Sequence, residues 1–243
     1  MLYSVIIPTL NEEKIIHKLL DQLTNEQLQK NFNLEIIISD GGSTDKTLEI
    51  VRKYGNIKVI ENPPGKKQNI AMGRNVGGFA AKGDILIFFN ADVILENPLQ
   101  LFQTIKDEFE QSNYVAMTCD VRVLPNEEKL IDILFHTIYN RYLEMLNYIN
   151  IGMGRGECHI IRKEIFYKLN GYDEKLAAGE DFDLFRRACK LGKILWKRNL
   201  KVFESPRRYR KMGYLKVWWM WSRNAISVMF TGKSFDNEWT QVR

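Results

Sequence analysis

Cysteine is scarce and scattered in this chain of 243 residues. Cys119, Cys158 and Cys189 lie far apart and form no Cys-x-x-Cys pair, which argues against a disulfide scaffold and against a cysteine zinc site. The sequence has no Asn-x-Ser/Thr signal, and its first residues lack the basic flank of a signal peptide. These absences lead us to expect a reducing, cytoplasmic compartment.

Long apolar runs are absent as well. Residues 217–230, the most apolar late stretch, are interrupted by Ser222, Arg223 and Asn224, so no run reaches the ~18 residues of a membrane-spanning helix. Hydrophobic residues make up 45% of the chain and charged residues 27%, which is typical of a globular protein. The formal net charge of +5 suits an anionic ligand, a nucleic acid or a membrane surface without selecting among them.

Two common nucleotide-binding signatures are missing. No G-x-G-x-x-G follows the first expected strand, which argues against a dinucleotide oxidoreductase. No G-x-x-x-x-G-K-[ST] occurs anywhere, which excludes a P-loop nucleotide triphosphatase.

Short β-branched runs alternate with helical patterns in the first half of the chain. The expected strands cover residues 3–7, 34–39, 57–61 and 85–90. The expected helices follow a cap at Asn11, run from a cap at Thr44 or Asp45 to about 53, and cover about 67–81 and 99–111. This alternation predicts a mostly parallel sheet covered on both faces, with ligands bound outside the carboxyl ends of its strands.

The second half is less regular. We expect a strand over 115–123, a long helix over 130–149, a glycine-rich loop over 152–156, a strand over 157–162 and a helix over 180–191. No repeat or low-complexity linker separates the halves. The chain therefore reads as one continuous domain.

Three polar clusters fall at the carboxyl ends of the expected strands, at 8–11, 40–43 and 90–92. Asp40 suits a hydrogen bond to a ribose or a nucleobase, and Asp92 suits a hard divalent cation, which prefers oxygen ligands. Among the basic residues nearby, Lys66, Lys67 and Arg74 either meet phosphates or carry ordinary surface charge.

A pair of acids, Glu180 and Asp181, begins the last expected helix after a run of small residues. Acidic side chains at a helix N-terminus are favoured by the helix dipole, which accounts for one of them. Asp183 adds a third acid, which exceeds the needs of capping. A carboxylate held there beside a cleft suits general-base catalysis.

Four ordered blocks of this sequence resemble the family 2 inverting glycosyltransferases, which have the GT-A fold. The first two blocks are SVIIPTLNE (4–12) and IIISDGGSTDKT (36–47). The next two are GRNVGGFAAKGDILIFFNAD (73–92) and KLNGYDEKLAAGEDFDL (168–184). Each block is short, but the ordered set is highly specific.

The resemblance implies an α/β fold of the GT-A type: a Rossmann-like, mostly parallel central sheet flanked by helices, with a helical C-terminal extension. It implies a transferase domain over 1–205, with a nucleotide-binding half over about 1–112 and an acceptor half over about 113–205. The remaining segment, 206–243, is basic and aromatic and is expected to be helical.

The resemblance also assigns roles to single residues. A nucleoside-diphosphate sugar would be bound by Pro8, Asn11, Glu12, Asp40, Gly42, Lys67, Arg74, Asn90 and Ala91, with Asp40 holding the base. Asp92 would ligate the Mn²⁺ or Mg²⁺ that neutralises the diphosphate leaving group. Asp181, with Glu180 beside it, would deprotonate the acceptor hydroxyl for attack at the anomeric carbon with inversion.

Two departures from the family pattern are visible. Asn90 stands where the family has the first acid of its Asp-x-Asp motif, so we expect weaker metal binding without loss of function. The Gln-x-x-Arg-Trp signature of processive synthases is absent, and residues 207–210 in a comparable region read RRYR. Transfer of a single sugar is therefore favoured over polymer extension.

Several alternatives remain open. A nucleotidyltransferase binds nucleotides on a similar fold, and a non-catalytic nucleotide-sugar-binding protein could retain it. The acceptor is a carbohydrate hydroxyl, a lipid-linked acceptor or a lipid phosphate; no nucleic acid is expected as a partner. The aromatic run VWWMW (217–221), with Phe230 and Trp239 beyond it, suits either a peripheral contact with the cytoplasmic membrane face or packing on the domain or in a homodimer.

Overall fold

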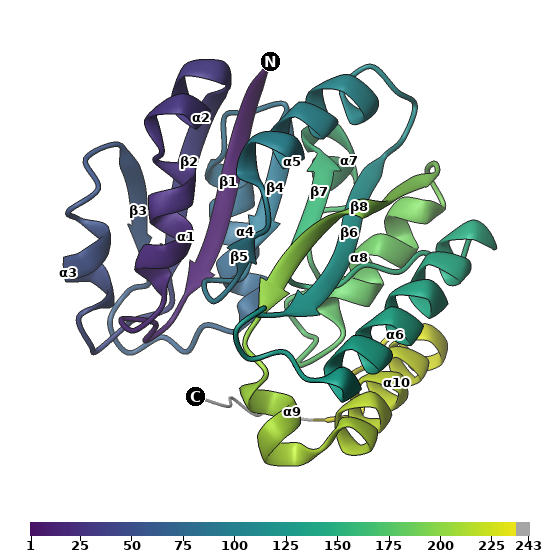
Figure 1. Cartoon of the computed structure of the whole chain (residues 1–243). Coiled ribbons are helices and arrows are strands. Elements are labelled where there is room, and N and C mark those ends of the chain that lie inside the picture. Colours follow the sequence, from purple (N-terminus) through teal and green to yellow (C-terminus); the bar gives the residue numbers. More distant parts are fainter. Residues whose placement is uncertain (237–243) are drawn as a thin grey trace.

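The first half of the chain builds strands and helices in alternation. The computed structural model describes residues 1–236 (Figure 1). Its first eleven elements are β1 (Leu2–Thr9), α1 (Ile16–Leu23), α2 (Glu26–Asn31), β2 (Asn33–Asp40), α3 (Thr47–Val51), β3 (Ile57–Glu61), α4 (Ile70–Ala80), β4 (Ile85–Phe89), β5 (Ile94–Leu95), α5 (Pro98–Thr104) and the π-helical turn η1 (Ile105–Phe109). The strands predicted around residues 3–7, 34–39, 57–61 and 85–90 are confirmed.

The second half adds three strands and five helices. These elements are β6 (Ala116–Val123), α6 (Leu130–Tyr148), β7 (Cys158–Arg162), α7 (Lys163–Lys168), α8 (Glu180–Cys189), β8 (Ile194–Glu204), α9 (Arg207–Met212) and α10 (Tyr214–Thr231). The predicted strands at 115–123 and 157–162 and helices at 130–149 and 180–191 are confirmed within a few residues. The sequence reading missed α2, α7 and the strands β5 and β8.

All eight strands of the described chain form one sheet in the order β3-β2-β1-β4-β7-β6-β8-β5. β1 pairs in parallel with both β2 and β4, and β2 pairs in parallel with β3. β7 runs antiparallel between β4 and β6, whereas β6 and β8 are parallel. The carboxyl ends of β1, β2 and β4 therefore meet at one edge of the sheet, where open α/β sheets bind ligands.

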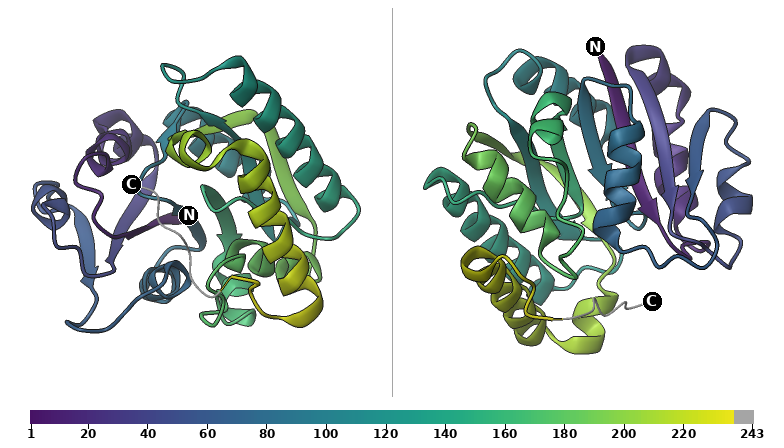
Figure 2. Two further views of the ribbon diagram at one scale, coloured as in Figure 1. Left: turned by 90° about the horizontal axis from the view of Figure 1, so that it is seen from below. Right: turned by 180° about the vertical axis from the view of Figure 1, so that it is seen from behind.

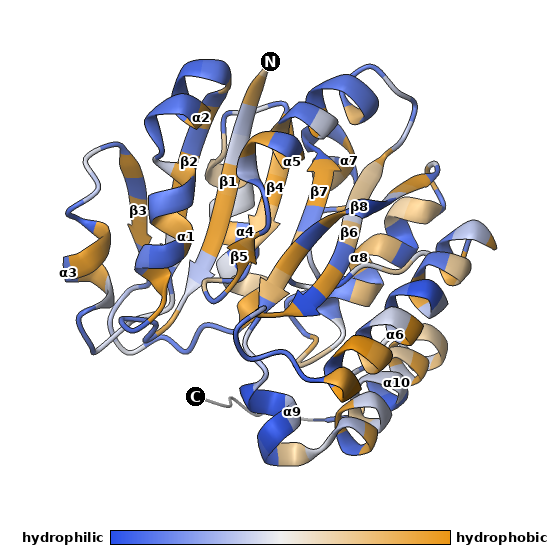
Figure 3. Cartoon of the chain, viewed as in Figure 1, coloured by the Kyte–Doolittle hydropathy of each residue, from blue (hydrophilic) through white to orange (hydrophobic). Residues whose placement is uncertain are grey.

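The strands of the sheet consist largely of apolar residues (Figure 3), and buried apolar side chains form a core on each face. One core packs the strands against α1, α2, α3 and α5, with Ile16, Leu20 and Phe102 fully buried. The other packs them against α4, α7 and α8, with Phe166 and Phe185 fully buried. The two helix layers lie on opposite sides of the sheet in the front and rear views (Figures 1 and 2). The expected α/β fold of the GT-A type is confirmed.

Three helix starts differ from the prediction. α1 begins only at Ile16, and Asn11, predicted to cap it, instead adopts a left-handed φ of 54° and accepts a hydrogen bond from the Thr44 amide. α3 begins at Thr47, past both predicted caps. α4 begins at Ile70 because the Asn69 side chain caps it, accepting the Met72 amide at 2.8 Å.

The C-terminal helices pack on the second half of the domain, beside the ligand edge of the sheet. Trp221 of α10 stacks on Tyr139 of α6, and Tyr209 of α9 packs edge-on against Trp221. The predicted packing of this segment on the domain is thus seen for residues 206–236, while Trp239 lies outside the described residues. None of the helices within residues 1–236 is long and apolar enough to cross a bilayer.

Candidate active site

A cleft of about 660 Å³ opens at the carboxyl ends of β1 and β4. The start of α8, the end of β8 and the inner sides of α6 and α10 form its other walls. Nine of the residues predicted from the sequence line it: Pro8, Glu12, Lys67, Arg74, Asn90, Ala91, Asp92, Glu180 and Asp181. Its volume suits a ligand of several hundred daltons.

Three predicted donor residues, Asn11, Asp40 and Gly42, are not among the described residues that line the cleft. Asp40 is almost fully buried, and its carboxylate accepts hydrogen bonds from the amides of Gly42 (2.8 Å) and Ser43 (2.9 Å) and from the Ser43 hydroxyl. The Asn11 amide in turn donates to the Ser43 hydroxyl at 2.9 Å. Asn11 and Asp40 thus hold the loop after β2, whose Gly41 reaches the cleft, and direct contacts of Asn11, Asp40 and Gly42 with a donor stay a prediction.

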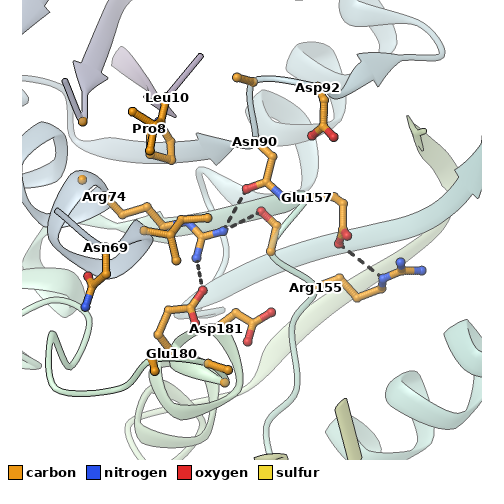
Figure 4. A pocket seen from close by; sticks show the side chains of 18 of the residues that line it. Pro8, Leu10, Asn69, Arg74, Asn90, Asp92, Arg155, Glu157, Glu180 and Asp181 are labelled. Carbon is orange, nitrogen blue, oxygen red and sulfur yellow. Dashed lines mark hydrogen bonds and ion pairs between the residues drawn. The ribbon is translucent and has the colours of Figure 1, made fainter. Parts of the chain in front are cut away.

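Arg74 joins four parts of the site (Figure 4). Its guanidinium, fully buried on α4, donates to Glu180 Oε1 at 2.7 Å, Asn90 Oδ1 at 3.0 Å and the Gly156 carbonyl at 3.0 Å. A buried charge is stable only when paired and hydrogen-bonded in this way. Arg74 is thus a buried cation at the cleft wall that ties α4, Asn90 after β4, the loop before β7 and α8 together, and its contact with a donor phosphate stays a prediction.

Asp181 is the acid of the pair that faces the open cleft (Figure 4). Its Oδ1 accepts the amide of Phe182 at 2.9 Å. Burial, followed by the charge of Glu180, raises the pKa of Asp181 to about 7, while Arg74 acts in the opposite direction. A carboxylate with a pKa near neutrality is suited to taking a proton.

Glu180 has a different position from its neighbour. Its carboxylate is buried and occupied by Arg74. Both acids line the cleft, with Glu180 paired to Arg74 and Asp181 the more exposed of the two. The catalytic role of the pair stays a prediction, and the Glu180–Arg74 contact links the first turn of α8 to α4.

Asp92 follows β4 and lies on the opposite wall from α8 (Figure 4). Its Oδ2 is 2.8 Å from Nη2 of Arg207, at the start of α9, and Glu12 Oε2 is 3.8 Å from the same nitrogen. Among the described residues, no group of three or more His, Cys, Asp or Glu side chains is arranged to hold a metal ion. The chain thus offers a single cleft-facing carboxylate after β4 for a cation.

A second buried charge cluster was missed by the sequence reading. Arg155 is 2.6 Å from Glu204 and 3.3 Å from Glu157, and its guanidinium lies over the rings of Tyr139 and Trp221. Burial and the charge of Glu157 raise the pKa of Glu204 to about 8, although Arg155 opposes this shift. The only signal in the sequence was the glycine-rich loop at 152–156, which gives no indication that its arginine is buried.

Comparison with known proteins agrees with this geometry. The family model described as "Glycosyl transferase family 2" matches residues 4–169. A mannosyltransferase from Pyrobaculum calidifontis, solved in complex with GDP-Man and Mn²⁺, superposes with a TM-score of 0.70 at 19% identity, over 92% of this chain and 61% of that one. At this identity the superposition shows a shared fold.

Two curated proteins show similarity in sequence. The "Dolichyl N-acetyl-alpha-D-glucosaminyl phosphate 3-beta-D-2,3-diacetamido-2,3-dideoxy-beta-D-glucuronosyltransferase" of Methanococcus voltae is 40% identical over 116 residues, covering 43% of this chain and 35% of that protein. The "Probable glycosyltransferase YdaM" of Bacillus subtilis (strain 168) is 28% identical over 234 residues, covering 89% of this chain and 52% of that protein. The chain thus spans between about a third and a half of these relatives.

Proposed function

The chain belongs to glycosyl transferase family 2, and on that premise we propose that it transfers a single sugar from a nucleoside-diphosphate sugar to an acceptor, with inversion at the anomeric carbon. The observation that carries this proposal is the position of Asp181, a carboxylate of raised pKa that faces Asp92 across the cleft. A base on one wall and a leaving-group site on the other are what in-line displacement requires.

The donor occupies the part of the cleft next to β1 and β4 in this proposal. Pro8 and Gly41 come from the ends of β1 and β2, and Lys67 lies on the loop before α4. Lys67 is exposed at the cleft edge and supplies a positive charge for phosphate. Asn11, Asp40 and Gly42 contribute by holding the loop in shape.

The residues after β4 fit a divalent cation that arrives together with the donor. Asp92 supplies one carboxylate oxygen, the ligand chemistry that Mn²⁺ and Mg²⁺ prefer, and the donor's own phosphates would supply others. Such an ion, when bound, neutralises charge on the diphosphate as the glycosidic bond breaks. The Mn²⁺ and GDP-Man of the Pyrobaculum enzyme support this assignment.

Asp181 acts as the general base. Its carboxylate accepts the proton of an acceptor hydroxyl while the oxygen attacks the anomeric carbon and the nucleoside diphosphate departs. Glu180 and Arg74 are positioning residues in this proposal, because their buried ion pair at the cleft wall links the N-terminus of α8 to α4. A lipid phosphate acceptor, in contrast, already carries a negative oxygen and has little need of the base.

The test is a donor screen by nucleoside-diphosphate release, with and without Mn²⁺, followed by Asp181→Asn. We expect the variant to lose roughly 10²- to 10⁴-fold in turnover, as is usual for removal of a general base, while binding nucleoside diphosphate like the wild type. Asp173→Asn, which changes an acid of the loop ahead of α8 that does not line the cleft, is the matched control.

Three results would change the assignment. Near-normal transfer by Asp181→Asn to a hydroxyl acceptor would remove Asp181 from the mechanism. Normal transfer to a lipid phosphate would favour that acceptor class. Nucleotide-sugar binding without release of diphosphate from any donor would instead favour a binding protein that does not catalyse transfer.

A further inference from the structure

α6 exposes an unusually apolar side for a helix on a protein surface. Ile131, Leu134, Ile138, Tyr142 and Met145 recur every three or four residues and are all exposed, Leu134 by 57% and Ile138 by 61%. Surface helices ordinarily place polar residues on the side that faces water. A continuous apolar stripe of this length marks a contact surface.

α10, which packs against α6, also exposes apolar side chains. The two helices run beside one another in the view from below (Figure 2), and Trp221 stacks on Tyr139 where they meet. Trp219 is 59% exposed and Phe230 is 81% exposed. We call the exposed apolar residues of both helices the α6–α10 surface.

The segment that carries α9 and α10 has charge of only one sign. Residues 205–235 contain seven Lys and Arg residues and no Asp or Glu. Within the described chain, Lys211, Lys216 and Lys233 form no ion pair and are all exposed. Apolar and positively charged side chains thus occur together at this end of the molecule.

From this combination we propose that the α6–α10 surface docks on a bilayer containing anionic lipids. Aromatic side chains with lysines around them bind the interface of such membranes, where apolar burial and electrostatic attraction add. A second copy of this chain is the less favoured occupant, because a two-fold interface would bring the same positive segments together. The orientation follows from the helices, which lie on the membrane without crossing it.

Docking in this way brings the cleft to the membrane. The inner sides of the same two helices supply Tyr139, Trp221 and Asn224 to the cleft wall. If the proposed transferase activity is correct, an acceptor held in the bilayer would enter from this side. Only this last step rests on the proposed function; docking itself does not.

The experiment is cosedimentation of the full chain with vesicles of phosphatidylcholine alone or with 30% phosphatidylglycerol. We expect binding to the anionic vesicles that weakens with added salt, because screening reduces the contribution of the lysines. Leu134→Glu/Ile138→Glu should reduce partitioning at least about tenfold. Lys211→Gln/Lys216→Gln should reduce it by about fivefold for each lysine removed.

Val76→Glu/Leu191→Glu is the control, since both residues are exposed apolar side chains outside α6 and α10. Thermal melting and nucleoside-diphosphate binding check that each variant is folded.

Wild-type protein that stays in the supernatant at low salt, or equal loss of binding in the control, would overturn the proposal. A wild-type dimer that Leu134→Glu/Ile138→Glu converts to monomer, without vesicle binding, would assign the surface to a second copy. Vesicle binding by a protein with no transferase activity would support docking and count against the proposed function alone.

Discussion

Replacing Glu180 by Gln should lower the pKa of Asp181 and move the acidic limb of the pH–activity profile to lower pH. The Glu180 charge disfavours ionisation of its neighbour, and this substitution removes it. Arg74, which favours the ionised form of Asp181, also loses its carboxylate partner. Both changes act in the same direction, so the sign of the shift is fixed.

The magnitude follows from Coulomb's law. Two unit charges about 6–8 Å apart interact by roughly 2–3 kcal/mol at an effective dielectric constant of about 20. Asp181 is partly exposed, which weakens the interaction, so we expect a shift of ~1 pH unit. A base of pKa about 7 is roughly one-tenth ionised at pH 6, whereas one of pKa about 6 is half ionised. Relative to its own plateau, the variant should therefore gain about fivefold in activity at pH 6.

The measurement is kcat/KM for nucleoside-diphosphate release between pH 5 and 9, because this quantity reports the ionisation of the free enzyme. Glu164→Gln, at an exposed acid of α7, is the control for loss of one negative charge. The plateau of Glu180→Gln is expected to fall, since α8 loses its contact with Arg74. An acidic limb that stays in place or moves to higher pH would refute the coupling of the two acids, and with it Asp181 as the titrating base.

Three further outcomes test the rest of the site. Arg207→Gln removes the partly exposed ion pair of Asp92, which is worth about 0.2–1 kcal/mol. Calorimetry should therefore show that Mn²⁺ binds the nucleotide-free variant up to about fivefold more tightly than wild type, and an unchanged affinity would show that Arg207 does not compete with the metal for Asp92. Asn90→Asp should change that affinity by less than about twofold, because the new carboxylate pairs with Arg74; a larger gain would show that the acid reaches the ion. Gly156→Ala places a Cβ 2.8 Å from Nη2 of Arg74, so it should lower both the activity and the free energy of unfolding, the latter by about 1–3 kcal/mol in a thermal or denaturant melt. The control Gly55→Ala has open space around its Cβ and should change neither.

The strands were predictable because their sequence pattern is local. β1, β2 and β4 are short apolar runs bounded by proline, glycine or polar residues, and each is buried on both faces, which is the pattern of a parallel sheet. β8 was missed because its eleven residues include Lys197, Arg198, Asn199 and Lys201, and its pairing with β6 and β5 is what makes it a strand. Information of that kind lies in the partner strand and is absent from the segment itself.

The site residues divide in the same way. Asp92 and Asp181 follow directly from their positions at a strand end and a helix start, so a linear motif locates them. The burial of Arg74 could not be read from the chain, because its partners Glu180 and Gly156 are 106 and 82 residues away. For Asn11 and Asp40 a contact with the donor stays a prediction, because polar residues at a strand end either face the ligand or brace the loop, and the sequence does not distinguish the two.

The Asn90 position explains how the donor and acceptor walls depend on each other. Because its Oδ1 accepts from Arg74, and Arg74 also binds Glu180, the loop after β4 and the start of α8 share one buried cation. An aspartate at this position would add a second carboxylate to that cation and compete with Glu180 for it. The neutral amide lets Arg74 keep its short contact with Glu180, the neighbour of the proposed base Asp181. The departure from two acids after β4 is therefore compatible with catalysis, provided that the charge missing near the metal is supplied by the donor phosphates.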